Sequence, residues 1–258
     1  MIPKVIHYCW FGHNPKPKSV LKCIESWKKY CPDYEIIEWN EDNFPIGDNL
    51  YCKQAYEAKK WAFATDYARL VIIYNNGGIY LDTDVELIKP WDELLVHEFF
   101  IGRQPGFQVN TGAGFGAVKG HPVLKRMIDD YADIPFIKEN GEFDLWTCPH
   151  RNSQWLFENG LKADDSYQEI AGVAIYPIEY FSPLDAWTRS LSKTSKTYSI
   201  HHCDATWNDN ESNFEKNKRA LLYKCNKVLD FIIHIPNHLI KLILGNKRYS
   251  EFVNKIKK

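Results

Sequence analysis

The amino-acid sequence predicts an α/β fold in which a parallel sheet carries helices on its faces. In the first 90 residues, short apolar segments alternate with segments whose apolar residues recur at helical spacing. Such alternation of strand and helix is typical of parallel strands joined by helical crossovers. The chain has 258 residues, of which 45% are apolar, so it is long enough to bury a substantial core.

The individual elements can be placed in chain order. The pattern predicts a strand at 4–10, a helix at 18–30, a strand at 34–39, one or two helices at 51–75 and a strand at 79–87. Pro32 stops the first helix, and the Gly77-Gly78 pair ends the last one before the third strand. After Pro90 the alternation weakens, and the pattern predicts two strands within 98–118, helices at 122–133 and 152–161, and short strands at 173–177 and 197–202.

We expect one main domain over residues 1–214, followed by a basic amphipathic helical segment at 215–258. Residues 219–258 hold nine Lys or Arg residues against two acidic ones, a net charge of +7, while the rest of the chain carries −8. This asymmetry, together with apolar residues that alternate with lysines, indicates peripheral contact with an anionic membrane. The alternatives are that these helices pack on the main domain or join two copies of the chain in a homo-oligomer.

Composition excludes several classes of protein. The net charge of −1 argues against a nucleic-acid binder. The seven cysteines are odd in number and show no zinc spacing, which indicates reduced thiols. The N-terminus lacks the apolar core of a signal peptide, and charged residues and a proline interrupt the apolar stretch at 228–244, so we expect no transmembrane helix. These features together predict a cytoplasmic protein.

The most informative segment is 61–86, because it holds a candidate metal site. Asp82 and Asp84 lie one residue apart in the predicted third strand, so we expect both carboxylates on the same side of the sheet. Carboxylate oxygens suit Mg²⁺ or Mn²⁺, and unpaired charges are costly to bury. The alternative interpretation is a solvated strand end.

A basic partner precedes this pair. Asp66 and Arg69 are three residues apart, so they share one face of the predicted helix, and their apolar neighbours make the ion pair at least partly buried. The alternative is an ordinary surface ion pair. An arginine beside a metal ion can hold a diphosphate. The segment therefore indicates an enzyme that uses a nucleotide-activated donor.

Residues 61–84 also fill a longer pattern without a gap: aromatic-x-x-x-S/T-D-x-x-R-x-x-x-L/I-x-x-x-G-G-x-Y-x-D-x-D. This pattern resembles the DXD-containing glycosyltransferase family of capsular polysaccharide sugar transferases and fungal initiating mannosyltransferases (glycosyltransferase family 32-like), a distant relative of clostridial glucosylating toxins. Residues 2–12 resemble the family's first strand and donor-base loop. The resemblance covers about residues 2–207 and implies a GT-A-type, Rossmann-like fold with a mixed central sheet flanked by helices.

The resemblance implies roles for the residues of this segment. Asp84 is expected to bind the metal directly, and Asp82 to contact the metal and the donor ribose. Arg69 is expected to meet the diphosphate or the donor sugar, and Asp66 the sugar hydroxyls. Asn110 precedes a run of small residues and touches the donor sugar or the acceptor, or else is a turn residue.

The other side of the donor pocket is expected to come from the first loop. Trp10, Phe11 and Gly12 form the donor-base loop in the family pattern, with Trp10 stacked on the base. The alternative for Trp10 is a core residue at the end of the first strand. His150 is expected to lie on the acceptor side at most.

Two carboxylates need a further protein ligand to hold a metal. In related enzymes that ligand lies five residues before a Trp, which corresponds to His202 ahead of Trp207. The neighbouring His201 is the alternative ligand. Trp207 is expected to pack over the diphosphate or the leaving group.

The implied activity is that of a metal-dependent retaining glycosyltransferase. It would move a hexose (galactose, glucose or an N-acetylhexosamine) to a lipid-linked oligosaccharide in capsule, O-antigen or exopolysaccharide synthesis, at the inner face of a bacterial plasma membrane. A UDP-sugar donor is favoured because the Trp10 loop resembles uridine binders, and a GDP-sugar stays open. The alternatives are a toxin-like protein glycosyltransferase and a catalytically silent nucleotide- or glycan-binding module. A metal-dependent phosphohydrolase is a further alternative, but it would need a second cluster of metal ligands, which the sequence does not show.

Overall fold

The computed structural model describes residues 1–186, 188–203 and 221. Most of them belong to one compact unit, which contains 1–185 and 191–203. The few others belong to a second unit, most of which lies outside the described residues. Outside the described residues lie Trp207, the domain boundary expected at 214, and nearly all of the helical segment expected at 215–258.

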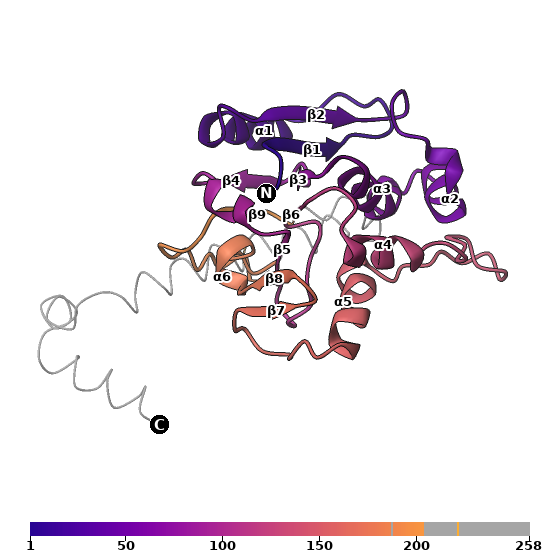
Figure 1. Ribbon diagram of the computed structural model, residues 1–258. Helices are drawn as coiled ribbons and strands as arrows, with labels where there is room; N and C mark the ends of the chain where they lie inside the picture. The colour runs from indigo at the N-terminus through magenta and orange to yellow at the C-terminus, as the bar shows by residue number, and fades with distance from the viewer. Residues whose placement is uncertain (187, 204–220, 222–258) are drawn as a thin grey trace, which may run out of the picture. The chain divides into compact units, whose positions relative to one another are not determined.

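A mixed seven-stranded sheet runs through the main unit, in the order β2-β1-β3-β6-β5-β8-β7 (Figure 1). Its strands are β1 (Val5–Cys9), β2 (Glu35–Trp39), β3 (Gly78–Tyr80), β5 (Phe99–Gly102), β6 (Phe115–Ala117), β7 (Gln168–Ile170) and β8 (Val173–Tyr176). β1 pairs in parallel with β2 and β3, and β5 pairs in parallel with β8. β6 runs antiparallel to both β3 and β5, which makes the sheet mixed.

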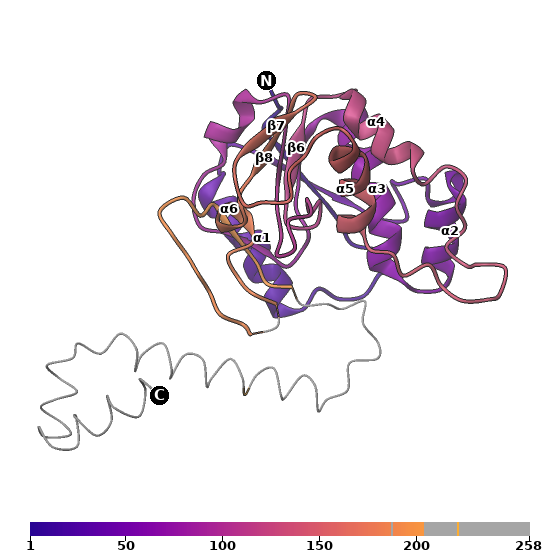
Figure 2. The ribbon, with the colours of Figure 1, turned by 90° about the horizontal axis from the view of Figure 1, so that it is seen from below.

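Helices cover both faces of this sheet (Figure 2). They are α1 (Lys18–Tyr30), α2 (Leu50–Glu57), α3 (Trp61–Asn76), α4 (Pro122–Asp129), α5 (Cys148–Glu158) and α6 (Ile178–Phe181), with 3₁₀ turns η1 (Ile46–Asp48) and η2 (Asp92–Val96). The predicted α/β fold with a mixed central sheet flanked by helices is therefore confirmed. Among the described residues, no helix has both the length and the apolar character needed to cross a membrane.

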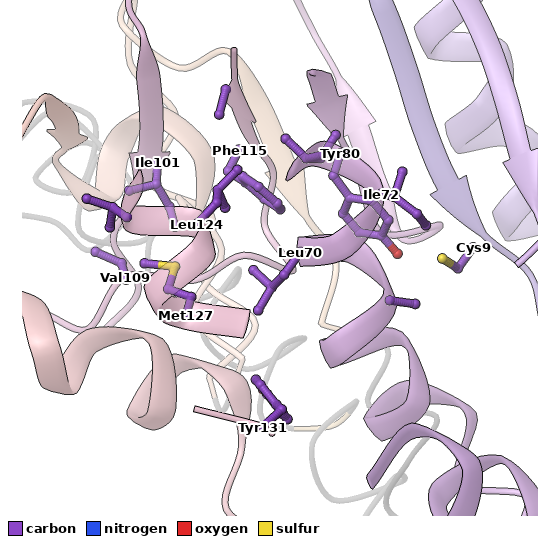
Figure 3. Packing of buried hydrophobic residues seen from close by; sticks show 14 of the residues in the cluster. Cys9, Leu70, Ile72, Tyr80, Ile101, Val109, Phe115, Leu124, Met127 and Tyr131 are labelled. Carbon is purple, nitrogen blue, oxygen red and sulfur yellow. The ribbon is translucent and has the colours of Figure 1, made fainter. Parts of the chain in front are cut away.

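The two faces of the sheet bury separate hydrophobic cores. Successive strand residues point to opposite faces, so Phe99 and Ile101 of β5 join one core and Phe100 joins the other. On the first face, Leu70 of α3 and Met127 of α4 pack with the sheet (Figure 3). On the second face, α1 packs against the sheet through apolar residues at helical spacing. This double-sided burial fixes the edge of the sheet at which β1 and β3 end.

The third strand differs from its predicted extent. A single strand at 79–87 is wrong, because β3 ends at Tyr80 and the chain turns before β4 (Val85–Leu87). In that turn the Val85 N–H donates to the Asp82 carbonyl at 3.0 Å. β4 then leaves the main sheet and pairs antiparallel with β9 (Ser199–His201). β7 and α6 also form where the sequence pattern predicts no element.

Candidate functional site

The two aspartates of the DXD sequence lie on the turn that joins β3 to β4, and α1 holds that turn from one side. The Trp27 indole N–H donates to the Val85 carbonyl at 2.7 Å, and the Leu87 N–H donates to the Ser26 hydroxyl oxygen at 2.9 Å. These bonds satisfy backbone groups on the edge of β4 that faces α1, away from the main sheet. The turn is therefore built on a fixed support.

β9 holds the turn from the other side and brings a histidine to it. Val85 pairs with His201 in the antiparallel register, and the His202 N–H donates to the Asp84 carbonyl at 2.9 Å. The side chain of His201 joins those of Asp82 and Asp84, with one ligand atom from each residue lying within 4.8 Å of the others. Strand pairing between distant segments thus assembles a three-residue cluster.

The electrostatics of the cluster favour a bound cation. Burial raises the pKa of Asp82 to about 6; the charges of Arg69 and His201 oppose this rise, and that of Asp84 adds to it. Burial acts to lower the pKa of His201, but the Asp84 carboxylate outweighs it and holds this pKa well above 6.5. The carboxylates therefore draw positive charge to the cluster. Two carboxylates and an imidazole fit a divalent metal such as Mn²⁺.

The two neighbouring histidines have different surroundings. His201 Nε2 lies 3.4 Å from Asp84 Oδ1, while its Nδ1 lies 3.6 Å from the Cys203 sulfur. The Cys203 contact would leave Nε2 available for a metal. His202 Nε2 instead lies 2.9 Å from Glu86 Oε2, which takes it out of the cluster. The geometry therefore favours His201 as the protein ligand.

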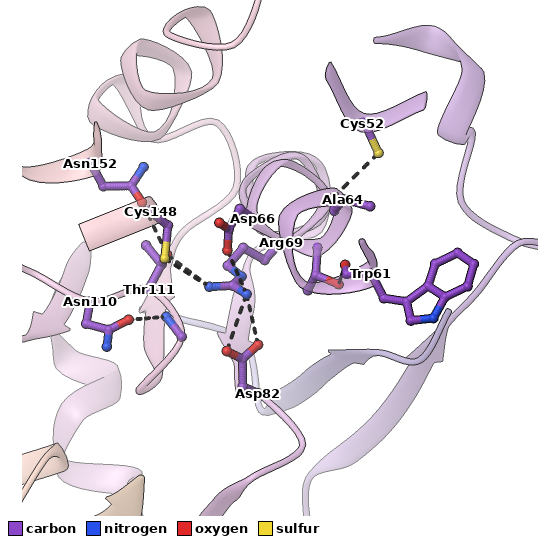
Figure 4. A network of polar contacts seen from close by, with 12 residues as sticks. Cys52, Trp61, Ala64, Asp66, Arg69, Asp82, Asn110, Thr111, Cys148 and Asn152 are labelled. Atoms are coloured by element: carbon purple, nitrogen blue, oxygen red, sulfur yellow. Dashed lines mark hydrogen bonds and ion pairs between the residues drawn. The ribbon is translucent and has the colours of Figure 1, made fainter. Parts of the chain in front are cut away.

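Arg69 joins this cluster to α3 and is buried (Figure 4). Its Nη2 lies 3.1 Å from Asp66 Oδ1 and donates to both carboxylate oxygens of Asp82, at 3.1 and 3.3 Å. The Tyr80 ring lies 5.2 Å from the guanidinium carbon. The Nε atom of Arg69 is buried without a hydrogen-bond partner among the described residues. A fixed positive charge with an unused donor suits a phosphate-bearing ligand.

Asp66 links Arg69 to the start of α5. Burial raises the pKa of Asp66, while the charge of Arg69 and the backbone N–H of Cys148 oppose that rise. The Cys148 sulfur lies 3.5 Å from Arg69 Nη1. Thr111 lies 3.4 Å from the same nitrogen, and its hydroxyl donates to Asn152 Oδ1 at 3.2 Å. The N-terminal turn of α5 thus contacts Arg69 on the side away from Asp82.

A loop of small residues packs directly on the charged groups. Arg69 and its partners Asp66 and Asp82 form a charged clamp. The Gly112 N–H donates to Asn110 Oδ1 at 2.8 Å, which places the buried Asn110 beside this clamp. A Cβ atom at Gly112 would lie 2.6 Å from Asp82 Oδ2 and 3.2 Å from Arg69 Nη1. The position therefore requires glycine for close approach of the backbone.

The segment after β1 contains the residues expected to bind the base. Trp10 is half-buried, and its indole N–H donates to the Asn14 carbonyl at 2.6 Å. Phe11 is buried and packs with Phe44 and Tyr56. The Gly12 N–H donates to the Glu41 carboxylate, and its φ of +91° favours glycine. Trp10 therefore keeps part of its surface exposed to solvent, whereas Phe11 does not.

Four residues that sequence reasoning missed contribute to the site: Thr111, Gly112, Cys148 and Asn152. The run of small residues after Asn110 was a usable signal for Gly112. Cys148 and Asn152 reach the site only because the fold brings the start of α5 against Arg69 and Thr111. Trp207 lies outside the described residues.

Comparison with known proteins agrees with this geometry. Residues 17–101 match the family described as "Glycosyltransferase sugar-binding region containing DXD motif". The predicted resemblance to DXD-containing glycosyltransferases is thus confirmed, and the matched segment includes α1, α3 and the DXD turn.

Curated relatives extend the similarity. The inositol phosphoceramide mannosyltransferase 3 of Schizosaccharomyces pombe is 32% identical over 52% of this chain and 38% of its own length. The initiation-specific alpha-1,6-mannosyltransferase of Candida albicans is 23% identical over 80% of this chain and 72% of its own length. The chain spans less than half the length of the fission-yeast relatives that it matches. Both of these relatives are named as mannosyltransferases.

Among solved structures, a glycosyltransferase involved in the glycosylation of the major capsid of PBCV-1 is similar with a TM-score of 0.49. It shares 12% sequence identity over 85% of this chain and 99% of that chain.

Proposed function

We propose that this chain is a metal-dependent retaining glycosyltransferase that uses a nucleotide-sugar donor. The observation that carries the proposal is the placement of two carboxylates and an imidazole beside a buried arginine. Such a site can bind a metal ion and a diphosphate side by side. In this scheme Asp82, Asp84 and His201 hold the metal, and Arg69 faces the diphosphate.

The chemistry is the exchange of one bond at the anomeric carbon of the donor sugar. The bond from this carbon to the diphosphate oxygen breaks, and the bond to the acceptor oxygen forms on the same face. Asp82, Asp84 and His201 would hold a divalent metal, which would supply neutralising charge for the departing diphosphate. Arg69 adds a fixed positive charge for the same oxygens, and Asp66 orients both the arginine and the sugar hydroxyls. The acceptor proton passes to the leaving diphosphate, so that charges and atoms balance.

The relatives and the first loop support a proposal for the donor and for the stereochemistry. Three relatives are named as an alpha-1,6-mannosyltransferase, an inositol phosphoceramide mannosyltransferase and a human alpha-1,4-N-acetylglucosaminyltransferase. Alpha products from alpha-linked donors mean retention of configuration. We propose a UDP-hexose or UDP-N-acetylhexosamine, with Trp10 stacked on the uracil, and GDP-mannose as the alternative donor.

For the acceptor we propose a lipid-linked glycan at the cytoplasmic face of a bacterial membrane. The net charge of +7 in residues 219–258 supports contact with anionic lipid. Flotation with phosphatidylglycerol vesicles, compared between the full chain and a variant whose basic residues in 219–258 are replaced by Gln, tests this contact. Equal flotation of both proteins would refute it.

Hydrolysis and transfer assays test the enzymatic proposal directly. The wild type should release UDP or GDP from one of UDP-galactose, UDP-glucose, UDP-N-acetylglucosamine or GDP-mannose, and only with Mn²⁺ or Mg²⁺ present. Asp84→Ala should abolish this release. Asp129→Ala is the matched control, because Asp129 is exposed and, within the described part of the chain, forms its ion pair with Lys125 one turn away on α4. Release without metal, or full activity of Asp84→Ala, would refute the metal-dependent mechanism.

A further inference from the structure

Exposed aromatic and aliphatic side chains gather between α4 and α5. In this segment, residues 136–144 fold back on themselves, with Ile137 bridged to Phe143 and the Lys138 N–H donating to the Glu142 carbonyl at 2.8 Å. Leu145 and Trp146 follow, and they are 54% and 44% exposed. Large apolar side chains that stay in contact with water beside a site can mark a ligand surface.

Trp146 is held in place despite its exposure. The guanidinium of the buried Arg151 lies 4.9 Å from the Trp146 ring centroid. Asp144 fixes both residues, since it accepts from Arg151 Nη2 at 2.6 Å and from the Trp146 backbone N–H at 3.2 Å. The His150 ring stacks on Trp146 with centroids 6.5 Å apart and 28° between the planes. Contacts of this kind fix the indole before any ligand arrives.

This surface borders the candidate active site. Trp146 lies two residues before Cys148, whose sulfur is 3.5 Å from Arg69 Nη1. Two residues of chain span at most about 7 Å. The backbone of Trp146 therefore lies beside that of Cys148, which itself contacts Arg69.

We propose that Trp146, together with His150, binds a neutral pyranose ring of the acceptor glycan. A pyranose has an apolar C–H face and a rim of hydroxyls, which matches an indole flanked by the exposed imidazole of His150. This inference rests on the proposed transferase function, and it assigns the acceptor side that the metal and donor residues leave open.

Charge argues for a sugar instead of a lipid surface at this place. The segment 132–147 contains Asp133, Glu139, Glu142 and Asp144 against the single Lys138. An acidic segment is repelled by anionic lipid headgroups, which attract basic ones. A neutral sugar ring carries no such penalty.

Binding of simple glycosides tests the proposal without any need for turnover. The probes are the methyl α-glycosides of glucose, galactose, mannose and N-acetylglucosamine, titrated by saturation-transfer NMR. The wild type should bind at least one of them. Trp146→Ala should weaken that binding at least 10-fold, Trp146→Phe should keep it within about 3-fold, and Leu145→Ala should leave it unchanged. Thermal melts confirm that the variants fold, as expected for exposed positions.

The other outcomes overturn the assignment. If the wild type binds none of the glycosides, or if Trp146→Ala binds them as well as the wild type does, Trp146 does not bind the acceptor sugar. Loss of phosphatidylglycerol-vesicle binding in both Trp146→Ala and Leu145→Ala, with glycoside binding unchanged, would make the surface a membrane contact. Donor hydrolysis in the absence of acceptor separates this result from failure of the proposed function, because Trp146→Ala should hydrolyse donor at the wild-type rate.

Discussion

Replacing Arg69 by methionine should reveal how much of the fold depends on the charged clamp. Methionine keeps an unbranched side chain that reaches about as far as arginine Nε, and it removes the charged end of the guanidinium group. The side chain of Arg69 is 3% exposed, and its partners Asp66 and Asp82 are 10% and 26% exposed. The substitution therefore leaves two carboxylates without their shared cation in a largely dry site.

The expected loss is about 3–5 kcal/mol of unfolding free energy, which is typical of breaking a buried ion pair from one side. For a domain of this size, such a loss lowers the melting temperature by roughly 10 °C. Urea unfolding at pH 7 without added metal measures it. Arg126→Met on α4 is the matched control, since Arg126 is 45% exposed and pairs with Asp130 one turn away; it should cost below about 1 kcal/mol.

A second substitution tests the stated cause. In the Arg69→Met background, Asp66→Asn removes one of the unpaired charges and should recover about 1 kcal/mol or more, a coupling usual for residues in one network. A loss below about 1 kcal/mol for Arg69→Met would refute the reasoning, because the clamp would then be solvated. A full loss with no recovery on adding Asp66→Asn would place the cost in packing instead of charge.

Thermal stabilisation by Mn²⁺ should disappear in His201→Ala and largely persist in His202→Ala, since only His201 lies among the carboxylates, and equal losses would contradict that assignment. Gly112→Ala should lower transfer roughly 100-fold by displacing Asp82, whose Oδ2 would lie 2.6 Å from the new Cβ; unchanged kinetics would take Gly112 out of the site. Burial lowers the pKa of His7 in the folded protein from 6.5 to about 4. As the pH falls below 6.5, His7 therefore binds a proton in the unfolded chain before it does so in the folded protein. Stability should fall by roughly 3 kcal/mol between pH 6.5 and 4, and urea unfolding of His7→Gln should lack that part of the slope.

Local patterns predicted the elements whose causes are local. The expected helix at 18–30 coincides with α1, and the helical region at 51–75 corresponds to α2 and α3. Their apolar spacing, the proline after α1 and the glycine pair after α3 act within a few residues. Asp66 and Arg69 come together for the same reason, since three residues on a helix place both on one face.

The parts that the sequence did not predict depend on contacts between distant segments. The apolar run at 79–87 resembles one strand, yet it divides because β4 finds its partners in β9 and α1 instead of the main sheet. The choice between His201 and His202 depends on the register of β9, which no local pattern encodes. Asn152 enters the site only through the packing of α5 against the loop that holds Thr111.

The candidate metal ligands Asp82, Asp84 and His201 lie at one end of the two-stranded ribbon of β4 and β9. A two-stranded ribbon is marginal by itself, and β4 gains support mainly from its bonds to α1. β9 supplies His201, and the next residue, His202, is held to the turn by the bond from its N–H to the Asp84 carbonyl. A metal that joins His201 to Asp82 and Asp84 would therefore tie β9 to the turn more firmly. Metal affinity and the order of β9 must then rise and fall together, because each is linked to the other through the same three side chains.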